Sequence, residues 1–353
     1  TLSDIYSTYY AEFLEVFDSI AIPKYLKNAF FIEGGSLAVE NALKVAFDWK
    51  VRKNLIKNKN DKGYKIIHFK EAFHGRTGYT LSLTNTDPIK TKYFPKFDWP
   101  RVENPHVNFP LTEQTVSDVE KKEKIAIEQI HKALKNNPDD IAGLIIEPIQ
   151  GEGGDNHFRP EFFATLRGLA DRYEFLLIFD EVQTGIGLTG KMWGYQHFGI
   201  EPDVLSFGKK TQVCGILAGN RIDEVQDNVF RQSTRINSTW GGNLVDMVRF
   251  KKHLEIIEEE CLIENARCIG DYLLESLEVL QRESRGFITN TRGRGLMCAF
   301  DLPTRAVRDD FLKTAFELGL IVLGCGERAI RFRPVLSVVR EDVDRAINIV
   351  GRV

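Results

Sequence analysis

The middle of the chain alternates short apolar runs with patterns typical of helices, and this alternation constrains the fold more than any other feature. Apolar runs occur at 64–69, 142–148, 175–181 and 203–208, and helical patterns such as 160–173 lie between some of them. Continuous apolar strands separated by helices are typical of a mostly parallel sheet covered on both faces. The sequence therefore predicts an α/β fold built on a large domain of this kind.

Three segments are predicted along the chain. Residues 1–29 are an N-terminal segment with a helix predicted at 6–17, and residues 30–245 are the large domain. A long amphipathic pattern at 246–284 is predicted as one helix that leads away from the main sheet. This helix is the first element of a smaller α+β domain, which is predicted to span 246–353.

The composition excludes several classes of protein. With 43% apolar and 27% charged residues, the chain is typical of globular proteins. Its net charge of -3, with acids and bases mixed along the sequence, argues against a nucleic-acid or membrane partner. The five cysteines are scattered, without CxxC pairs or interleaved histidines. We therefore expect reduced thiols, no metal site and a cytoplasmic location.

Polar residues follow the predicted strands, at the edge where ligands bind in such sheets. These are Glu147, the pair Asp180 and Glu181, and the pair Lys209 and Lys210. Asp180 ends a buried run, so its carboxylate needs a cationic or hydrogen-bonding partner. That partner is either a salt bridge within the fold or a protonated heteroaromatic nitrogen of a cofactor.

The two adjacent lysines lie directly after an apolar strand in the stretch SFGKKTQVCG. A second cation nearby disfavours the protonated form of an amine, so one of the pair can have a lowered pKa and attack a carbonyl. Two exposed loop lysines are the alternative interpretation.

A glycine-rich turn precedes the first long helical pattern. Gly34, Gly35 and Ser36 would leave backbone N–H groups free at a helix N-terminus, which suits a phosphate, and Ser36 is predicted to cap that helix. A tight turn with a capping serine and no ligand is the alternative.

This order of phosphate turn, strand-end aspartate and strand-end lysine resembles the fold type I, class III pyridoxal-phosphate aminotransferases. The resemblance covers nearly the whole chain and rests on the motifs EGGSLAVENALK, AFHGRTGYTLSLTN, IIEPIQGEGG, FLLIFDEVQTGIGLTGK, DVLSFGKKTQVCG and NSTWGGN. Within the family, FPKFDWPR, FGKKTQVCG, NSTWGGNLVDMVR and RGRGLMCAF are most similar to members that act on the 6-amino group of lysine.

The resemblance implies pyridoxal 5'-phosphate as the cofactor. It implies Lys209, directly after Gly208, as the covalent attachment site, with Lys210 pointing elsewhere if the backbone stays extended. Asp180 is implied at the pyridine nitrogen. The other implied cofactor-binding residues are Gly35 and Ser36 at the phosphate, Phe73, His74 and Val182 beside the ring, Glu147 behind it, Gln183 at the phenolic oxygen, and Thr239 from the other subunit of a homodimer.

Two arginines and a glutamate are implied in substrate binding. Arg76 resembles the residue that holds the distal carboxylate, and Arg331 the residue that binds the α-carboxylate of glutamate or 2-oxoglutarate. Arg333 competes for the second role, because on a strand it would point to the same face as Arg331. Glu152 is implied to pair with Arg331 when lysine binds and to swing away for 2-oxoglutarate, a motion that its flanking glycines would permit.

The implied reaction transfers the 6-amino group of L-lysine to 2-oxoglutarate and yields 2-aminoadipate 6-semialdehyde and L-glutamate. Ornithine or 4-aminobutyrate as the amine donor is the first alternative, and a non-catalytic protein that binds the cofactor is the second. The reaction is compatible with two physiological roles, the breakdown of lysine and the supply of an aminoadipate precursor. Family members carry a further segment ahead of SDIYS, so we expect residues 1–29 to be a trimmed N-terminal part.

Overall fold

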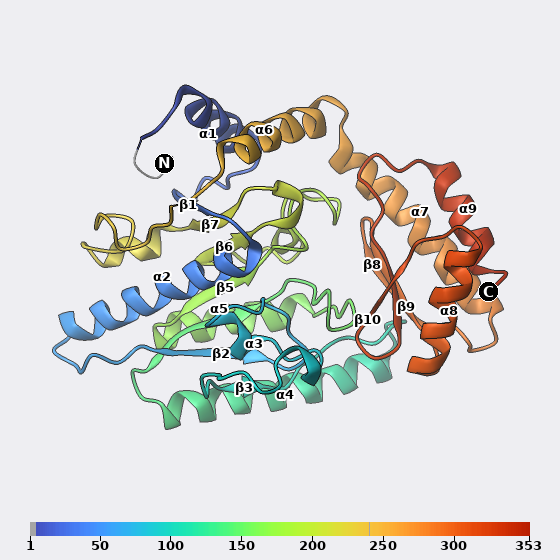
Figure 1. The fold of residues 1–353 in the computed structure, drawn as a ribbon. Helices are drawn as coiled ribbons and strands as arrows, with labels where there is room; N and C mark the ends of the chain where they lie inside the picture. The colour runs from blue at the N-terminus through green and yellow to red at the C-terminus, as the bar shows by residue number, and fades with distance from the viewer. Residues whose placement is uncertain (1–4, 240) are drawn as a thin grey trace.

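The computed structural model of the protein describes residues 5–239 and 241–353. Two sheets, each with helices packed against it, make up the fold (Figure 1). The strands are β1 Asn28–Ile32, β2 Lys65–Phe69, β3 Arg101–Val102, β4 Ile141–Ile146, β5 Leu176–Asp180, β6 Val204–Phe207, β7 Cys214–Ala218, β8 Thr289–Arg294, β9 Met297–Asp301, β10 Leu323–Cys325 and β11 Ala329–Phe332. The helices are α1 Thr8–Ile20, α2 Gly35–Ile56, α3 Thr80–Leu83, α4 Glu113–Asn136, α5 Pro160–Tyr173, α6 Leu244–Glu259, α7 Leu262–Glu283, α8 Arg305–Glu317 and α9 Arg340–Val350.

The larger sheet has seven strands in the order β1-β7-β6-β5-β4-β2-β3. From β3 to β6 every neighbouring pair is parallel, whereas β7 runs antiparallel to both β6 and β1. The four apolar runs of the sequence become β2, β4, β5 and β6. The predicted α/β fold with a mostly parallel sheet is therefore confirmed.

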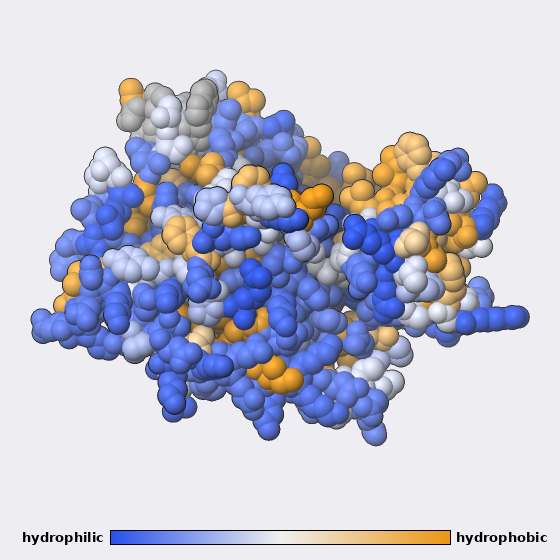
Figure 2. Space-filling model, turned by 60° about the horizontal axis from the view of Figure 1, so that its bottom comes forward, coloured by the Kyte–Doolittle hydropathy of each residue, from blue (hydrophilic) through white to orange (hydrophobic). Residues whose placement is uncertain are grey.

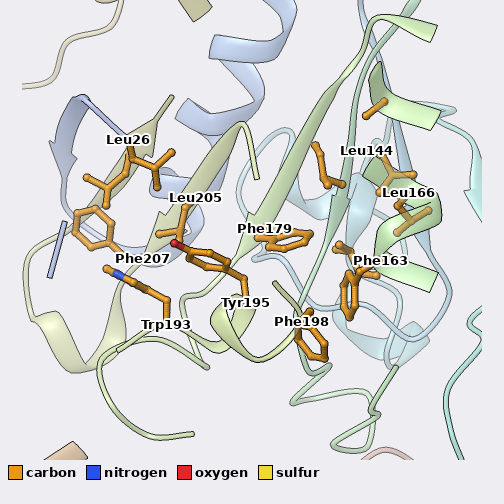
Figure 3. Close-up of a cluster of buried hydrophobic side chains, with 14 of the residues drawn as sticks. Leu26, Leu144, Phe163, Leu166, Phe179, Trp193, Tyr195, Phe198, Leu205 and Phe207 are labelled. Carbon is orange, nitrogen blue, oxygen red and sulfur yellow. The ribbon is translucent and has the colours of Figure 1, made fainter. Parts of the chain in front are cut away.

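Helices cover both faces of this sheet, because successive strand residues point to opposite sides. Ile178 of β5 and Val204 of β6 face one side and pack on α2. Phe179 and Phe207 face the other side, where α1, α5 and α6 pack. Figure 3 shows this second core, with Phe163 near Phe179 and with Trp193 near Phe207. Burial on both faces explains why the strands have no alternating polar positions.

The smaller sheet is antiparallel, in the order β10-β11-β9-β8. Helices α7, α8 and α9 supply apolar side chains to its separate core, and these elements lie together on the right of Figure 1. Helix α6 packs instead on α1, in the core of the larger sheet. The boundary at residue 246 stays a prediction, and the structure puts the change of core between α6 and α7.

Two local predictions are wrong. The pattern at 246–284 is two helices, not one, because Cys261 between them adopts a left-handed conformation with φ 52°. Ser36 does not cap α2, since that helix begins at Gly35 and its N-cap is Gly34 with φ 95°. Ser36 lies inside the first turn, and its hydroxyl bonds to other side chains.

One face of the surface is mostly polar. The face in Figure 2 is largely hydrophilic, with scattered apolar residues and a larger apolar group at the upper right. Among the described residues, no helix has the length and apolarity needed to cross a bilayer.

Candidate active site

A pocket of about 550 Å³ lies at the carboxyl ends of β4, β5 and β6. These strands are neighbours and run parallel, so the residues that follow them meet at one edge of the sheet. The pocket brings together almost all of the predicted site residues. Its lining includes Gly35, Ser36, Phe73, His74, Arg76, Glu147, Glu152, Asp180, Val182, Gln183, Lys209 and Arg331, together with Val39, Gly75 and Lys90, which were not predicted.

One end of the pocket is the N-terminus of α2. The first helical bond runs from Ala38 N to Gly34 O, so the N–H groups of Gly35 and Ser36 precede it and are free for an anion. A Cβ on Gly35 would lie 2.8 Å from Val182 Cγ1, so this turn needs glycine for its close approach. The geometry fits a phosphate.

Two threonines hold the Ser36 hydroxyl at this end. Its Oγ lies 2.8 Å from Thr77 Oγ1 and 2.7 Å from Thr80 Oγ1. It also accepts the backbone N–H of Arg76 at 3.2 Å. These bonds tie the loop after Phe73 to the start of α2.

Asp180, the last residue of β5, is buried in the floor of the pocket. Its Oδ2 lies 2.8 Å from His74 Nδ1, and its Oδ1 accepts the N–H of Val182 at 3.1 Å and the hydroxyl of Ser206 at 3.3 Å. The other ring nitrogen of His74 is buried and has no partner in the described part of the chain. Asp180 and His74 both line the pocket, and a carboxylate there suits a ring with a basic nitrogen.

Glu147 and Glu181 are both buried, but their carboxylates accept hydrogen bonds from different parts of the chain. Glu147 accepts the N–H groups of Phe73 and Gly151, each at 3.0 Å, and so positions two loops of the pocket. Burial raises its pKa to about 7 although nearby His74 opposes the rise. Glu181 points away from the pocket lining and accepts the N–H groups of Gly194 and Tyr195.

The two lysines lie in a 3-10 turn at Lys209–Thr211, where Lys209 has φ 54°. Lys209 lines the pocket, and Lys210 donates to the carbonyl of Gln183 at 2.6 Å. Burial, followed by the charge of Lys209, lowers the pKa of Lys210 to about 7. The expectation of an extended backbone is wrong, although the two side chains do diverge.

Arg331 has free hydrogen-bonding capacity in the pocket, and Arg333 does not share its position. Arg331 Nε and Nη1 are buried and lack a partner among residues 5–239 and 241–353. Arg333 pairs with Asp155 and donates to the carbonyl of Phe332. Arg333 Nε is also buried without a partner in the described part of the chain, but only Arg331 lines the active-site pocket. Arg331 is therefore the arginine that can bind a carboxylate in this pocket.

Glu152 lies between two cations. Its Oε1 accepts from Lys90 Nζ at 2.6 Å, and its Oε2 lies 3.4 Å from Arg331 Nη2. Lys90 also lies over the ring of Phe73, 5.4 Å from its centroid. Sequence reasoning missed Lys90, because no local pattern brings residue 90 to residue 152.

Two of the predicted site residues, Arg76 and Thr239, are exposed. The Arg76 side chain is exposed at the pocket wall, with no described contact to a carboxylate. Thr239 is exposed and does not line the pocket of its own chain. Its predicted contact with the cofactor of another subunit stays a prediction.

Comparisons with known proteins agree on one family. The family model of class-III aminotransferases matches residues 6–353. An L-lysine-epsilon aminotransferase of Mycobacterium tuberculosis is 51% identical over 346 residues, which cover 98% of this chain and 76% of the relative. One from Streptomyces clavuligerus is 46% identical with the same coverage.

A solved structure leads to the same family. Lysine aminotransferase from M. tuberculosis in the internal aldimine form superposes with a TM-score of 0.96 at 51% identity, covering 99% of this chain and 80% of that one. The free N–H groups at α2, the buried Asp180 and the pocket lysine Lys209 fit the phosphate, ring nitrogen and aldehyde of pyridoxal phosphate. The chain belongs to the class-III aminotransferases and is an enzyme that uses pyridoxal 5'-phosphate.

Proposed function

We propose that this enzyme transfers the 6-amino group of L-lysine to 2-oxoglutarate and yields 2-aminoadipate 6-semialdehyde and L-glutamate. The observation that carries the proposal is the arrangement of Glu152 beside Arg331, whose Nε and Nη1 are buried and have no partner among the described residues. One site must accept an amine end without a carboxylate and then an acceptor that has one. The relatives named for lysine support the choice of amine donor.

The cofactor, when bound, supplies an electron sink that stabilises negative charge on the substrate carbon. Gly35 and Ser36 would hold its phosphate through the N–H groups of α2, and Asp180 would keep a proton on its ring nitrogen. Phe73, Val182, His74, Glu147 and Gln183 line the same pocket. In this proposal Phe73 and Val182 would contact the ring, with His74 and Glu147 near it, and Gln183 would bind the phenolic oxygen.

Lys209 has two tasks in this proposal. Its Nζ would hold the cofactor covalently until the substrate amine displaces it, and the freed amine of Lys209 would then take the proton from carbon 6 of the substrate lysine. The side chain lies in the pocket, whereas Lys210 is held by the carbonyl of Gln183. That arrangement supports Lys209 as the reactive lysine of the pair.

Each of the two arginines binds a different substrate carboxylate in this proposal. The exposed Arg76 at the pocket wall binds the carboxylate distal to the reacting carbon. With lysine bound, Glu152 neutralises Arg331, so the cationic 6-amino end does not meet an unscreened guanidinium. With 2-oxoglutarate bound, its α-carboxylate takes the fork of Arg331 and Glu152 moves aside.

We further propose a cytoplasmic homodimer in which Thr239 reaches the cofactor phosphate of the partner. The exposed position of Thr239, outside the pocket of its own chain, supports this contact. All five cysteines are free thiols, which supports a reducing compartment.

The amine donor is tested by mixing the holoenzyme with lysine, ornithine or 4-aminobutyrate and following the cofactor absorbance. We expect the fastest conversion to the pyridoxamine form with lysine. A faster conversion with ornithine would overturn the proposed donor, and no response to any amine would favour a non-catalytic role.

A further inference from the structure

The two cations that contact the Glu152 carboxylate, Lys90 and Arg331, lie at different distances from it. The bond to Lys90 Nζ, at 2.6 Å, is a direct charge-assisted hydrogen bond. The approach to Arg331 Nη2, at 3.4 Å, is an ion pair at longer range. Lys90 therefore holds the carboxylate more closely than the arginine that the substrate needs.

Lys90 is anchored independently of Glu152. It ends the 3-10 turn Pro88–Lys90, which Asp87 caps by accepting the N–H of Ile89 at 3.0 Å. Its Nζ also donates to Thr86 Oγ1 at 3.1 Å. The ammonium can therefore stay in place while the carboxylate of Glu152 moves.

The backbone of Glu152 is fixed, so the movement is a rotation of its side chain. The N–H of Gly326 donates to Glu152 O at 2.9 Å. A Cβ on Gly151 would lie 1.3 Å from Gln183 Oε1, and one on Gly153 would lie 2.1 Å from Glu71 O. The flanking glycines allow close packing at both sides of Glu152. Our expectation that they permit the motion of Glu152 stays a prediction.

A second cavity gives this side chain room to rotate. It has a volume of about 490 Å³, and both Lys90 and Glu152 line it as well as the active-site pocket. The Lys90–Glu152 pair thus forms the wall between the two spaces. Glu152 can turn away from Arg331 into the second cavity and keep its bond to Lys90.

We propose that Lys90 is a positioning residue for the second substrate: it retains the Glu152 carboxylate when 2-oxoglutarate binds Arg331. The inference rests on the function proposed above. Without Lys90, the displaced carboxylate would lose the cation that it already contacts, beside an incoming dianion. Arg305 and Arg308 also line the second cavity, but among the described residues neither is paired with Glu152. Lys90 thereby lowers the free-energy cost of opening the acceptor site.

The test compares the two half-reactions of Lys90→Met by rapid mixing. For the second half-reaction, apoenzyme is loaded with pyridoxamine phosphate and mixed with 2-oxoglutarate. We expect about a fivefold higher KM for 2-oxoglutarate, the upper range for a partly exposed ion pair, and no rise in the KM for lysine. Lys90→Arg should restore the KM, and Lys92→Met, outside both cavities, is the matched control.

Two further measurements separate positioning from other roles. Calorimetry with glutarate, a non-reacting dicarboxylate, should show the same fivefold weakening in Lys90→Met. In a Glu152→Ala background, the Lys90→Met change should alter neither the KM for 2-oxoglutarate nor the affinity for glutarate, because there is no carboxylate to retain.

Equal KM and glutarate affinity in wild type and Lys90→Met would overturn the proposal. So would a fivefold effect that persists in Glu152→Ala, since Lys90 would then act on the substrate directly. Failure of the proposed function looks different, because wild-type enzyme loaded with pyridoxamine phosphate would not respond to 2-oxoglutarate, or wild-type holoenzyme would not respond to lysine.

Discussion

The floor and the mouth of the active site are built in different ways. At the floor, Asp180 and Glu147 are buried and accept several bonds from His74 and from backbone N–H groups. At the mouth, Glu152 is 33% exposed and shared between Lys90 and Arg331.

The difference matches the two kinds of ligand that the site must bind, a cofactor and a pair of substrates. A cofactor that stays bound through every turnover is best held by rigid, buried groups. Two substrates that alternate in one place need a charge that can be exchanged, and long side chains on fixed backbones supply it. Substitutions at the floor should therefore abolish chemistry, whereas those at the mouth should change the choice between substrates.

The largest effect is expected at Lys209. Lys209→Ala removes the proposed attachment site and base, so turnover should fall by at least about 10³-fold. Borohydride reduction followed by peptide mapping should find the cofactor on Lys209 in wild type and on no lysine in the variant. Lys210→Met should still be labelled at Lys209. Labelling of Lys210 would reverse the assignment.

Asp180→Asn should be next in size. The amide keeps the shape but loses the carboxylate charge that would keep the cofactor nitrogen protonated, so kcat should fall by about 10²- to 10³-fold. Steady-state kinetics at saturating cofactor measures it. Ser206→Ala, which removes only a 3.3 Å bond to the same carboxylate, is the control and should lose far less. Equal kcat in wild type and Asp180→Asn would contradict the role of the floor.

Glu152→Gln should separate the two substrates. Without the carboxylate, the charge of Arg331 repels the amine end of lysine, so the KM for lysine should rise by about tenfold, or ~1.4 kcal/mol. The KM for 2-oxoglutarate should not rise, because nothing must be displaced. Initial-rate kinetics with each substrate varied provides both constants. A parallel rise of both would mean that Glu152 supports the fold and does not select substrates.

The smallest expected effect concerns stability and Lys210. Its pKa is about 7 in the folded protein against an ordinary value of 10.5, so the unfolded chain binds more protons between those pH values. Stability of the apoprotein should therefore rise from pH 7 to pH 9, by roughly 1–2 kcal/mol relative to Lys210→Met. Urea unfolding at both pH values measures this difference. The same pH dependence in wild type and variant would show that Lys210 is charged and well solvated in the fold.

The floor of the site could be predicted from local sequence, and the mouth only in part. Glu147, Asp180 and Lys209 follow apolar strands, and parallel strands place such residues at one edge. The bond from Lys90 to Glu152 depends on how the loop after α3 folds over the pocket, which no periodicity encodes.

Two other predictions failed because the sequence did not indicate the local backbone conformation. The left-handed residue at Cys261 divides a pattern that is amphipathic on both sides, and no glycine marks the break. Likewise, Gly34 rather than Ser36 became the N-cap of α2, because the Ser36 hydroxyl bonds to Thr77 and Thr80 from a distant loop.

The central claim is that this enzyme takes the 6-amino group of lysine and delivers it to 2-oxoglutarate. Incubation of the holoenzyme with 2-oxoglutarate and L-lysine labelled with ¹⁵N at the 6-amino group, followed by mass spectrometry of the glutamate formed, tests it directly. The account predicts labelled glutamate from this lysine and unlabelled glutamate from lysine labelled at the 2-amino group. Label arriving from the 2-amino group, or no glutamate at all, would contradict it.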